Sequence, residues 1–303
     1  MKVYLNRRPK AGPWGGGIKT VNKLAESLIE SGHNVTFQLE EGIDVIFCID
    51  PRPNDGGEWY QHFIDYRYDN PSTKIVQRVG DLGTHSKPEL TELVHQTLNY
   101  SNFLIFPSEW ARDYIGFIGE NYKVIYNRPM KEFHQHKSDN VDLPEKVRLV
   151  THHWSMNPKK GFHLYQQLED HIRETEEFEF TYIGRKPDDV NISNYIEPIN
   201  ASQLAEELAK HNIYITASIE EAGANHVLEA MAAGLPVVYH KGGGSIVNYC
   251  EEYGVEFDSF DNLLSAIRKV IEYYGAFKDR VLSYEENNSI VVDEYLKIIE
   301  EMT

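Results

Sequence analysis

The sequence is poor in cysteine and in long apolar runs. Only two cysteines occur among its 303 residues, Cys48 and Cys250, and both lie in apolar or aromatic surroundings. We therefore expect buried free thiols, with neither a disulfide nor a cysteine-based metal site. No segment approaches the run of about 18 apolar residues that a transmembrane helix needs, and residues 1–10 do not resemble a signal peptide. These absences predict a cytoplasmic protein without a transmembrane segment, for which peripheral association with a membrane stays open.

Basic residues are also scarce. Lys and Arg number 30 against 47 Asp and Glu, which gives a formal net charge of -17. The excess of acid lies mainly in residues 147–303, where 13 basic side chains face 27 acidic ones, whereas residues 1–146 carry 17 and 20. Nucleic-acid binding normally draws on many Lys and Arg contacts to phosphate, so this acidity argues against a nucleic-acid partner.

Strand and helix signals alternate in the order that is typical of a parallel sheet. Residues 2–6 predict a strand, 18–31 a helix and 34–39 the next strand. Further apolar or β-branched runs predict buried strands at 45–49, 74–79, 103–106, 123–126, 148–151, 178–183 and 213–216. Helical periodicity covers 162–175 and the chain after 256, while 50–70 is expected to be irregular.

The length suffices for two domains of roughly 150 residues each. Residues 130–146 are polar and charged and carry little apolar periodicity. We therefore expect the interdomain linker there, between a first domain over 1–130 and a second that begins at 147.

The segment 213–238, IYITASIEEAGANHVLEAMAAGLPVV, combines a strand, a turn and a helix with two carboxylates, Glu221 and Glu229. The helix is expected to begin near Ala224 or Asn225, with Asn225 as its N-cap, and a glycine and a proline should end it. Ligands of parallel α/β sheets bind at the carboxyl ends of strands. Glu221 should therefore lie at a ligand site beside a helix N-terminus, which suits an anion.

This segment resembles the Glu-x7-Glu signature of the family 4 retaining glycosyltransferases, which have the GT-B fold. The matching residues follow the order of the signature: Ser218, Glu221, 228–232, Gly234, 236–238 and 242–243. Further matches run through most of the chain: 13–35, 104–110, 124–127 and 158–162. The resemblance implies an α/β, GT-B architecture of two Rossmann-like domains with parallel sheets facing across a cleft. By this resemblance 1–130 is the acceptor domain, 147–284 is the nucleotide-sugar donor domain, and a C-terminal helix at about 285–303 packs back on the first.

The resemblance also assigns roles to residues of the second domain. Glu229 would accept hydrogen bonds from the ribose hydroxyls, Glu221 would contact the donor sugar, and Lys160 would bind the diphosphate. Glu220 is an alternative to Glu221 but breaks the spacing of the signature. The turn between the two glutamates is assigned to the donor as well: Gly223, Ala224 and Asn225.

Two positions depart from the pattern of the family. Many relatives carry an aromatic residue where this chain has Gly223. The family usually places an arginine five residues before the lysine, and this chain has Ser155 there. Either Lys159 or Arg185 could supply the missing charge.

The first domain offers two groups of candidate ligand-binding residues. One is a glycine-rich turn, and the other is a histidine with an aspartate near it. Gly16 and Gly17, which follow Gly15, would let backbone N–H groups approach the donor diphosphate or the acceptor. His85 occupies the region where relatives place a histidine near the sugar C6 hydroxyl, and Asp81 would be its neighbour.

A basic patch lies at the start of this acidic chain. Residues 1–23 contain six Lys and Arg side chains and no acid, and Arg7, Arg8 and Lys10 directly follow the first strand. These three could contact the donor diphosphate or an anionic acceptor, and the alternative is a solvated loop.

The sequence therefore predicts a metal-independent retaining glycosyltransferase that moves a sugar from a nucleotide diphosphate sugar, UDP- or GDP-linked, to a hydroxyl acceptor such as a glycan, a lipid or a small molecule. The nucleotide sugar is a co-substrate, so no cofactor is expected. No Asp-x-Asp motif offers the oxygen ligands of a magnesium or manganese site, and His134 and His136 are expected to be solvated. The alternatives are another GT-B enzyme, either a nucleotide-sugar epimerase or a phosphorylase, and a non-catalytic sugar-nucleotide binding protein.

Overall fold

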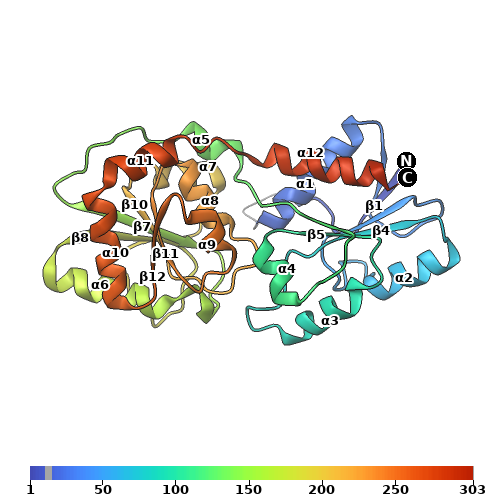
Figure 1. Ribbon diagram of the computed structural model, residues 1–303, viewed down its shortest axis with the longest axis horizontal. Coiled ribbons are helices and arrows are strands. Elements are labelled where there is room, and N and C mark those ends of the chain that lie inside the picture. Colours follow the sequence, from blue (N-terminus) through green and yellow to red (C-terminus); the bar gives the residue numbers. More distant parts are fainter. Residues whose placement is uncertain (11–15, 303) are drawn as a thin grey trace. The chain divides into compact units, whose positions relative to one another are not determined.

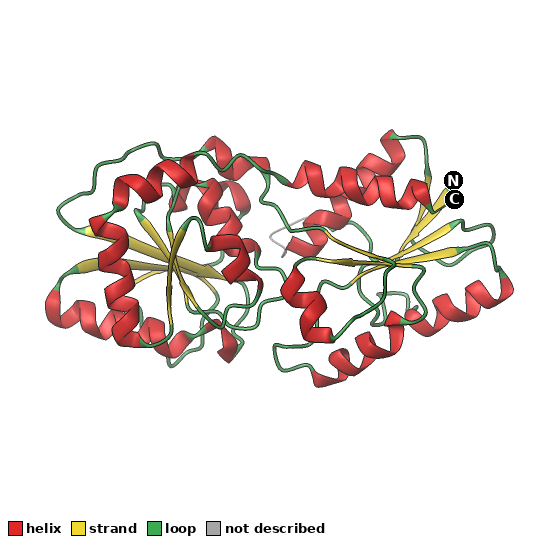
Figure 2. Ribbon diagram, viewed as in Figure 1, coloured by secondary structure: helices red, strands yellow, loops and turns green. Residues whose placement is uncertain are grey.

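The computed structural model describes the backbone of residues 1–10 and 16–302 and the side chains of 1–10 and 20–302. The chain forms two compact units. Unit 1 comprises Met1–Asn127 together with Asn288–Thr303, and unit 2 comprises Arg128–Asn287. Each unit contains a six-stranded, wholly parallel sheet with helices packed around it, as Figure 2 shows in yellow and red. The predicted α/β class with two Rossmann-like sheets is confirmed.

In unit 1 the strand order is β2-β1-β3-β4-β5-β6 (Figure 1). The strands are β1 (Lys2–Leu5), β2 (Asn34–Thr36), β3 (Val45–Cys48), β4 (Lys74–Arg78), β5 (Phe103–Phe106) and β6 (Tyr122–Val124). The helices are α1 (Gly16–Glu30), α2 (Tyr60–Asp69), α3 (Pro88–Leu98), α4 (Glu109–Ile115) and α12 (Asn288–Glu301). The chain leaves β1 for β2 on one side and resumes at β3 on the other, so the topological switch point lies between β1 and β3.

In unit 2 the order is β12-β11-β10-β7-β8-β9. The strands are β7 (Val147–His153), β8 (Phe178–Gly184), β9 (Asn194–Ile196), β10 (Ile213–Thr216), β11 (Val237–His240) and β12 (Gly254–Phe257). The helices are α5 (Lys131–Gln135), α6 (Phe162–Thr175), α7 (Ala201–Leu208), α8 (Asn225–Ala232), α9 (Ser245–Cys250), α10 (Phe260–Glu272) and α11 (Tyr274–Leu282), with a 3-10 turn, η1, at Pro158–Lys160. Here the switch point lies between β7 and β10.

Helix α12 belongs to unit 1 although it ends the sequence. Its apolar residues recur at helical spacing, and Val292, Tyr295 and Ile299 are buried in one core with residues of α1, β1 and β3. The Tyr295 hydroxyl also accepts a hydrogen bond of 2.9 Å from Nε of the buried Arg78 on β4. Figure 1 shows α12 in red beside α1 in blue. Unit 1 is therefore completed by chain that is remote in sequence.

Two stretches differ from the predictions. The expectation of an irregular 50–70 was wrong, because α2 occupies Tyr60–Asp69. Only Tyr60 and Phe63 of this helix are buried, so its amphipathic signal in the sequence is weak. The stretch 130–146, expected to be a linker, lies in unit 2, where Phe133 of α5 is fully buried.

Within the described residues, no helix has both the length and the apolar character that crossing a membrane requires.

The burial of α12 predicts a position-dependent effect on the stability of unit 1. Ile299→Ala should lower the free energy of unfolding by about 2–5 kcal/mol, because Ile299 is fully buried and truncation leaves a cavity. Ile290→Ala on the same helix is the control, since that side chain is 46% exposed and should change stability by about 0.5 kcal/mol or less. Hydrogen exchange of the β1 and β3 amides measures the stability of unit 1 in both variants. Equal losses of stability in Ile299→Ala and Ile290→Ala would contradict the packing of α12.

Candidate functional site

The candidate site of unit 2 lies at the carboxyl ends of β7 and β10. These strands are adjacent and parallel, and they mark the switch point of the sheet, where α/β proteins bind ligands. The chain leaves β7 through η1 into α6, and it leaves β10 through the turn 217–224 into α8. These two connections carry Lys160 and Glu221, and α8 carries Glu229.

Lys160 and Glu221 form an ion pair between the two connections. Lys160 Nζ donates a short hydrogen bond to Glu221 Oε1, and the side chains are only 11% and 13% exposed. The backbone joins the same segments, since Ile219 N donates to Lys159 O at 2.9 Å. Two residues to which the family resemblance gives the diphosphate and the sugar are thus neighbours in space.

Glycine makes this close approach possible. Gly161 has φ +79, and a Cβ added there would lie 2.4 Å from Ala217 Cβ and 2.5 Å from Ala217 O. A contact below 3 Å between such atoms is not tolerated without movement, so any other residue would push the connection after β7 away from the end of β10. The sequence Lys160-Gly161 therefore has a packing reason as well as an electrostatic one.

The glycine-rich loop 242–244 fixes the backbone of the two adjacent glutamates. Glu220 N donates to Gly242 O at 2.8 Å, Glu221 N donates to Gly243 O at 3.2 Å, and Ser245 N donates to Glu221 O at 2.9 Å. Glu220 has φ +54, which for a residue with a side chain is a strained backbone conformation. Its carboxylate pairs with Lys159, and both of these side chains are about one-third exposed. The two adjacent acids thus point to two different lysines.

Glu229 lies in the middle of α8 and is 6% exposed. Its Oε2 is 2.9 Å from Nε2 of His152 at the end of β7, and Nδ1 of His152 is 3.1 Å from the hydroxyl of Tyr214 on β10. An ionised carboxylate can only accept, so Nε2 of His152 must carry a proton. Burial raises the pKa of Tyr214 well above its ordinary value, which keeps its hydroxyl protonated. The three side chains form a buried hydrogen-bonded chain that orients Glu229.

Helix α8 is held at both ends. Ala224 N donates to the Ser245 hydroxyl at 3.1 Å before the first turn, and Gly234, at φ +85, follows the last turn. The buried ammonium of Lys278 donates to Gly234 O at 2.6 Å. The expectation of Asn225 as N-cap was wrong, because Ala224 holds that position and Asn225 is the first helical residue. The left-handed glycine at 234 was predicted correctly.

Two further histidines lie in the same buried network. His226 Nε2 is 3.0 Å from the Thr216 hydroxyl, and His153 Nε2 is 2.8 Å from the hydroxyl of Tyr165. Burial lowers the pKa of His226 to about 3, so its ring is neutral at pH 7. None of His152, His153 and His226 was among the catalytic or binding candidates taken from the sequence. Their positions at the carboxyl end of β7 and at the start of α8 were the available signal.

The proposed substitutes for the missing arginine have different surroundings. Lys159 is paired with Glu220. Arg185 is exposed, and its backbone N donates to His153 O at 2.9 Å at the ends of β8 and β7. Ser155 is exposed in the connection after β7. Gly223 lies in the turn before α8, as expected from the spacing.

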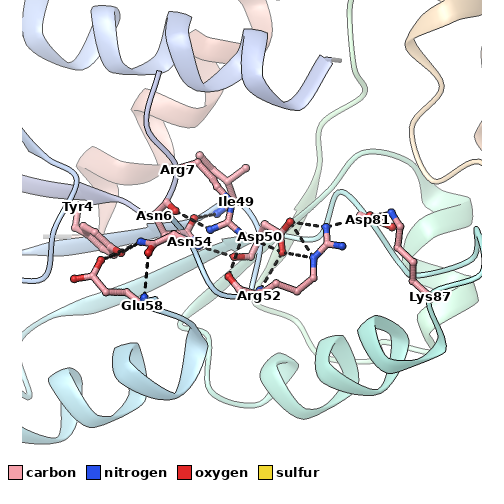
Figure 3. Close-up of polar contacts among 10 residues, drawn as sticks. All are labelled: Tyr4, Asn6, Arg7, Ile49, Asp50, Arg52, Asn54, Glu58, Asp81 and Lys87. Carbon is pink, nitrogen blue, oxygen red and sulfur yellow. Dashed lines mark hydrogen bonds and ion pairs between the residues drawn. The ribbon is translucent and has the colours of Figure 1, made fainter. Parts of the chain in front are cut away.

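The candidate residues of unit 1 lie in connections at the carboxyl ends of its strands. Asp81, after β4, accepts hydrogen bonds from Lys87 Nζ at 2.8 Å and from Arg52 Nη2 at 3.4 Å (Figure 3). His85 is half-buried in the same connection. Gly16 and Gly17 are the first residues of α1, whereas Gly15 lies outside the described residues. In the part of the chain that the structure describes, no group of three His, Cys, Asp or Glu side chains could hold a metal ion.

Residues 148–273, which include all of the candidate site in unit 2, match the family model of group 1 glycosyl transferases. No curated protein matches the sequence. The match confirms the predicted enzyme class for this part of the chain.

Solved structures share the fold over nearly the whole chain. Sucrose-phosphate synthase from Thermosynechococcus elongatus is similar with a TM-score of 0.73 at 13% identity, over 99% of this chain and 98% of that one. HepE of Anabaena, in complex with UDP and glucose, has a TM-score of 0.71 at 14% identity, over 99% and 100%. WaaG, a glycosyltransferase involved in lipopolysaccharide biosynthesis, has a TM-score of 0.68 at 14% identity, over 99% of each chain. The predicted GT-B fold class is confirmed.

The pKa of His226 predicts a pH-dependent stability. Its ordinary pKa of 6.5 applies to the unfolded chain and about 3 to the folded one, so protonation favours unfolding. The stabilising contribution is complete above about pH 6.5 and is lost toward pH 3, at up to about 1.4 kcal/mol per pH unit. In urea unfolding between pH 6.5 and 4, His226→Gln should therefore lose stability less steeply than the wild type.

The matched control is His95→Gln, because His95 is exposed on α3 and should keep the wild-type slope. If the free energy of unfolding falls with pH equally in the wild type and in His226→Gln, protonation of this ring does not destabilise the folded state, which contradicts the prediction.

Proposed function

We propose that the protein is a retaining glycosyltransferase that moves a sugar from a nucleotide diphosphate sugar to a hydroxyl acceptor. The observation that carries the proposal is that two buried pairs, Lys160 with Glu221 and His152 with Glu229, lie at the switch point of the segment that matches group 1 glycosyl transferases. The similar fold of HepE, a structure that contains UDP and glucose, supports a nucleotide sugar as donor.

In this proposal each of the three residues meets one part of the donor. Glu229, oriented by His152, accepts hydrogen bonds from the ribose hydroxyls, for which a fixed acceptor is suited. Lys160 neutralises the diphosphate as its charge grows during departure. Glu221, which is hydrogen-bonded to Lys160, contacts the sugar that the diphosphate carries.

The reaction breaks the bond between the anomeric carbon and the diphosphate oxygen and forms a bond from that carbon to the acceptor oxygen. The proton of the acceptor hydroxyl passes to the departing diphosphate oxygen on the same face of the sugar. This route retains the anomeric configuration and needs no carboxylate nucleophile, in contrast to retaining hydrolases. Charge on the leaving group is met by Lys160 and by N–H groups at the start of α6, so the proposal includes no metal.

A single experiment separates this function from its alternatives. UDP- and GDP-sugars are incubated with the full chain and a panel of hydroxyl acceptors in EDTA, and free nucleotide and product anomers are followed by NMR. The proposal expects nucleotide release coupled to a product with the donor's anomeric configuration. An altered free sugar nucleotide indicates an epimerase, binding without release indicates a binding protein, and activity that only Mg²⁺ or Mn²⁺ restores refutes the metal-independent mechanism.

The assigned role of Glu229 predicts a loss of nucleotide affinity. Glu229→Gln keeps the size of the side chain but removes the charge that two ribose hydroxyls would meet. Because hydrogen bonds to charged groups contribute about 1.5–3 kcal/mol, Kd for the nucleotide should rise at least about 10-fold in calorimetry. Glu256→Gln, an exposed acid on β12, is the control and should bind as the wild type does. An unchanged Kd in a folded Glu229→Gln removes the ribose assignment.

Lys160 should act mainly on turnover. Lys160→Ala is expected to lower kcat by about 100- to 1,000-fold, since one well-placed group that stabilises charge in the transition state contributes about 3–4 kcal/mol. Lys159→Ala, one residue away and paired with Glu220, should lower kcat less than about 10-fold. Steady-state kinetics decide between them, and the reverse ranking would assign the diphosphate to Lys159.

A further inference from the structure

Unit 1 has its own polar pocket at its topological switch point. The cavity has a volume of about 270 Å³. It is lined by residues 6–8 and 10 after β1, 37–39 after β2, and 54–56 and 58 between β3 and α2. Ligand pockets that enclose drug-sized molecules measure about 300–1,000 Å³, so this one suits a single sugar ring. None of the residues assigned to the donor in unit 2 contributes to it.

The floor of the pocket is a fixed network of hydrogen bonds (Figure 3). Glu58 accepts from the Tyr4 hydroxyl at 2.7 Å, from Asn54 Nδ2 at 3.0 Å and from Leu39 N at 2.8 Å. Asn6, buried at the end of β1, joins β1 to β3 by accepting from Ile49 N at 2.7 Å. These neutral donors fix the carboxylate of Glu58 in place and leave its negative charge in the lining, where the charges are those of Arg7, Arg8 and Lys10 against Asp55 and Glu58.

Of the three cations that directly follow β1, Arg7 and Lys10 are paired with other residues of unit 1. Arg7 donates to Asn6 O at 2.8 Å and to Arg52 O at 2.9 Å, and its guanidinium is 3.4 Å from Asp50. Although burial opposes it, hydrogen bonds from Arg52 and the charges of Arg52 and Arg7 hold the pKa of Asp50 below its usual value, so the carboxylate stays ionised. Lys10 Nζ forms an ion pair of 3.0 Å with Asp55.

Arg8 differs from both. It is exposed, and no ion pair or hydrogen bond joins it to a described residue. Its guanidinium carbon lies 6.0 Å from the centroid of the Phe37 ring, which also lines the pocket. The lining thus combines an aromatic ring with a cation that lies over it and whose N–H donors are available to a ligand. A sugar ring packs its C–H face on such an aromatic ring, and a carboxylate or phosphate matches the fork of the guanidinium.

We propose that this pocket binds the acceptor and that the acceptor is a sugar bearing a carboxylate or phosphate group. Arg8 pairs with the anionic group, and Phe37 packs against the ring. The acceptor role rests on the proposed transferase function, whereas the binding of an anionic sugar does not.

Binding is tested on the full chain with three probes that share a ring: glucuronic acid, glucose 6-phosphate and glucose. The two acidic sugars should bind the wild type at least about 10-fold more tightly than glucose in NMR titrations. Arg8→Gln should remove that preference, and Phe37→Leu should weaken all three. Lys297→Gln, which changes an exposed cation of α12 that is not part of the pocket lining, is the matched control and should keep the wild-type preference.

The outcomes distinguish the pocket from the transferase function. A wild type that binds glucose as tightly as the acidic sugars, or binds none of them, overturns the proposal, as does an unchanged preference in Arg8→Gln. Whether a carboxylate or a phosphate is preferred follows from the first two probes. If acidic sugars bind through Arg8 but no donor supports transfer, the pocket stands and the transferase function falls. If transfer proceeds only to neutral acceptors and is unchanged in Arg8→Gln, the transferase function is supported and the proposal for the pocket is refuted.

Discussion

The contact between the connection after β7 and the connection after β10 is the constraint on which the candidate donor site depends. Gly161 lies so close to Ala217 that no side chain fits between them. This approach brings Lys160 against Glu221, and parallel pairing of β7 with β10 brings His152 near the first turns of α8. The same sheet that builds the core of unit 2 therefore sets the relative positions of the charged groups.

The charged groups of this site have hydrogen-bonding partners within the protein. Lys160 with Glu221 and His152 with Glu229 are largely buried, and a buried charge is costly unless it is paired and hydrogen-bonded. Each pair joins a residue from the β7 side to one from the β10 side. A nucleotide diphosphate sugar carries phosphate anions and hydroxyl groups of its own. In the proposed function, Lys160 and the two glutamates therefore exchange contacts with one another for contacts with the donor, and none of these charges is left without a partner.

Local signals in the sequence predicted much of this arrangement. The bounds of α6 and β10 and the glycine after α8 follow from apolar periodicity and cap chemistry, which act over a few residues. Other features depend on contacts between distant segments. The pairing of Glu221 with Lys160 and of Glu220 with Lys159, and the N-cap at Ala224, are set by the glycine-rich loop and Ser245. Arg7 likewise differs from Arg8 because it contacts Asp50 and Arg52, which lie about forty residues further along the chain.

The central claim is that the donor nucleotide binds at the carboxyl ends of β7 and β10. Hydrogen–deuterium exchange of the full chain, measured peptide by peptide with and without saturating UDP, tests it most directly. The account predicts slower exchange in the connection that contains Lys160 and Gly161 and in the turn from Ala217 to Asn225. Calorimetric binding of UDP with no added protection in either segment would contradict it.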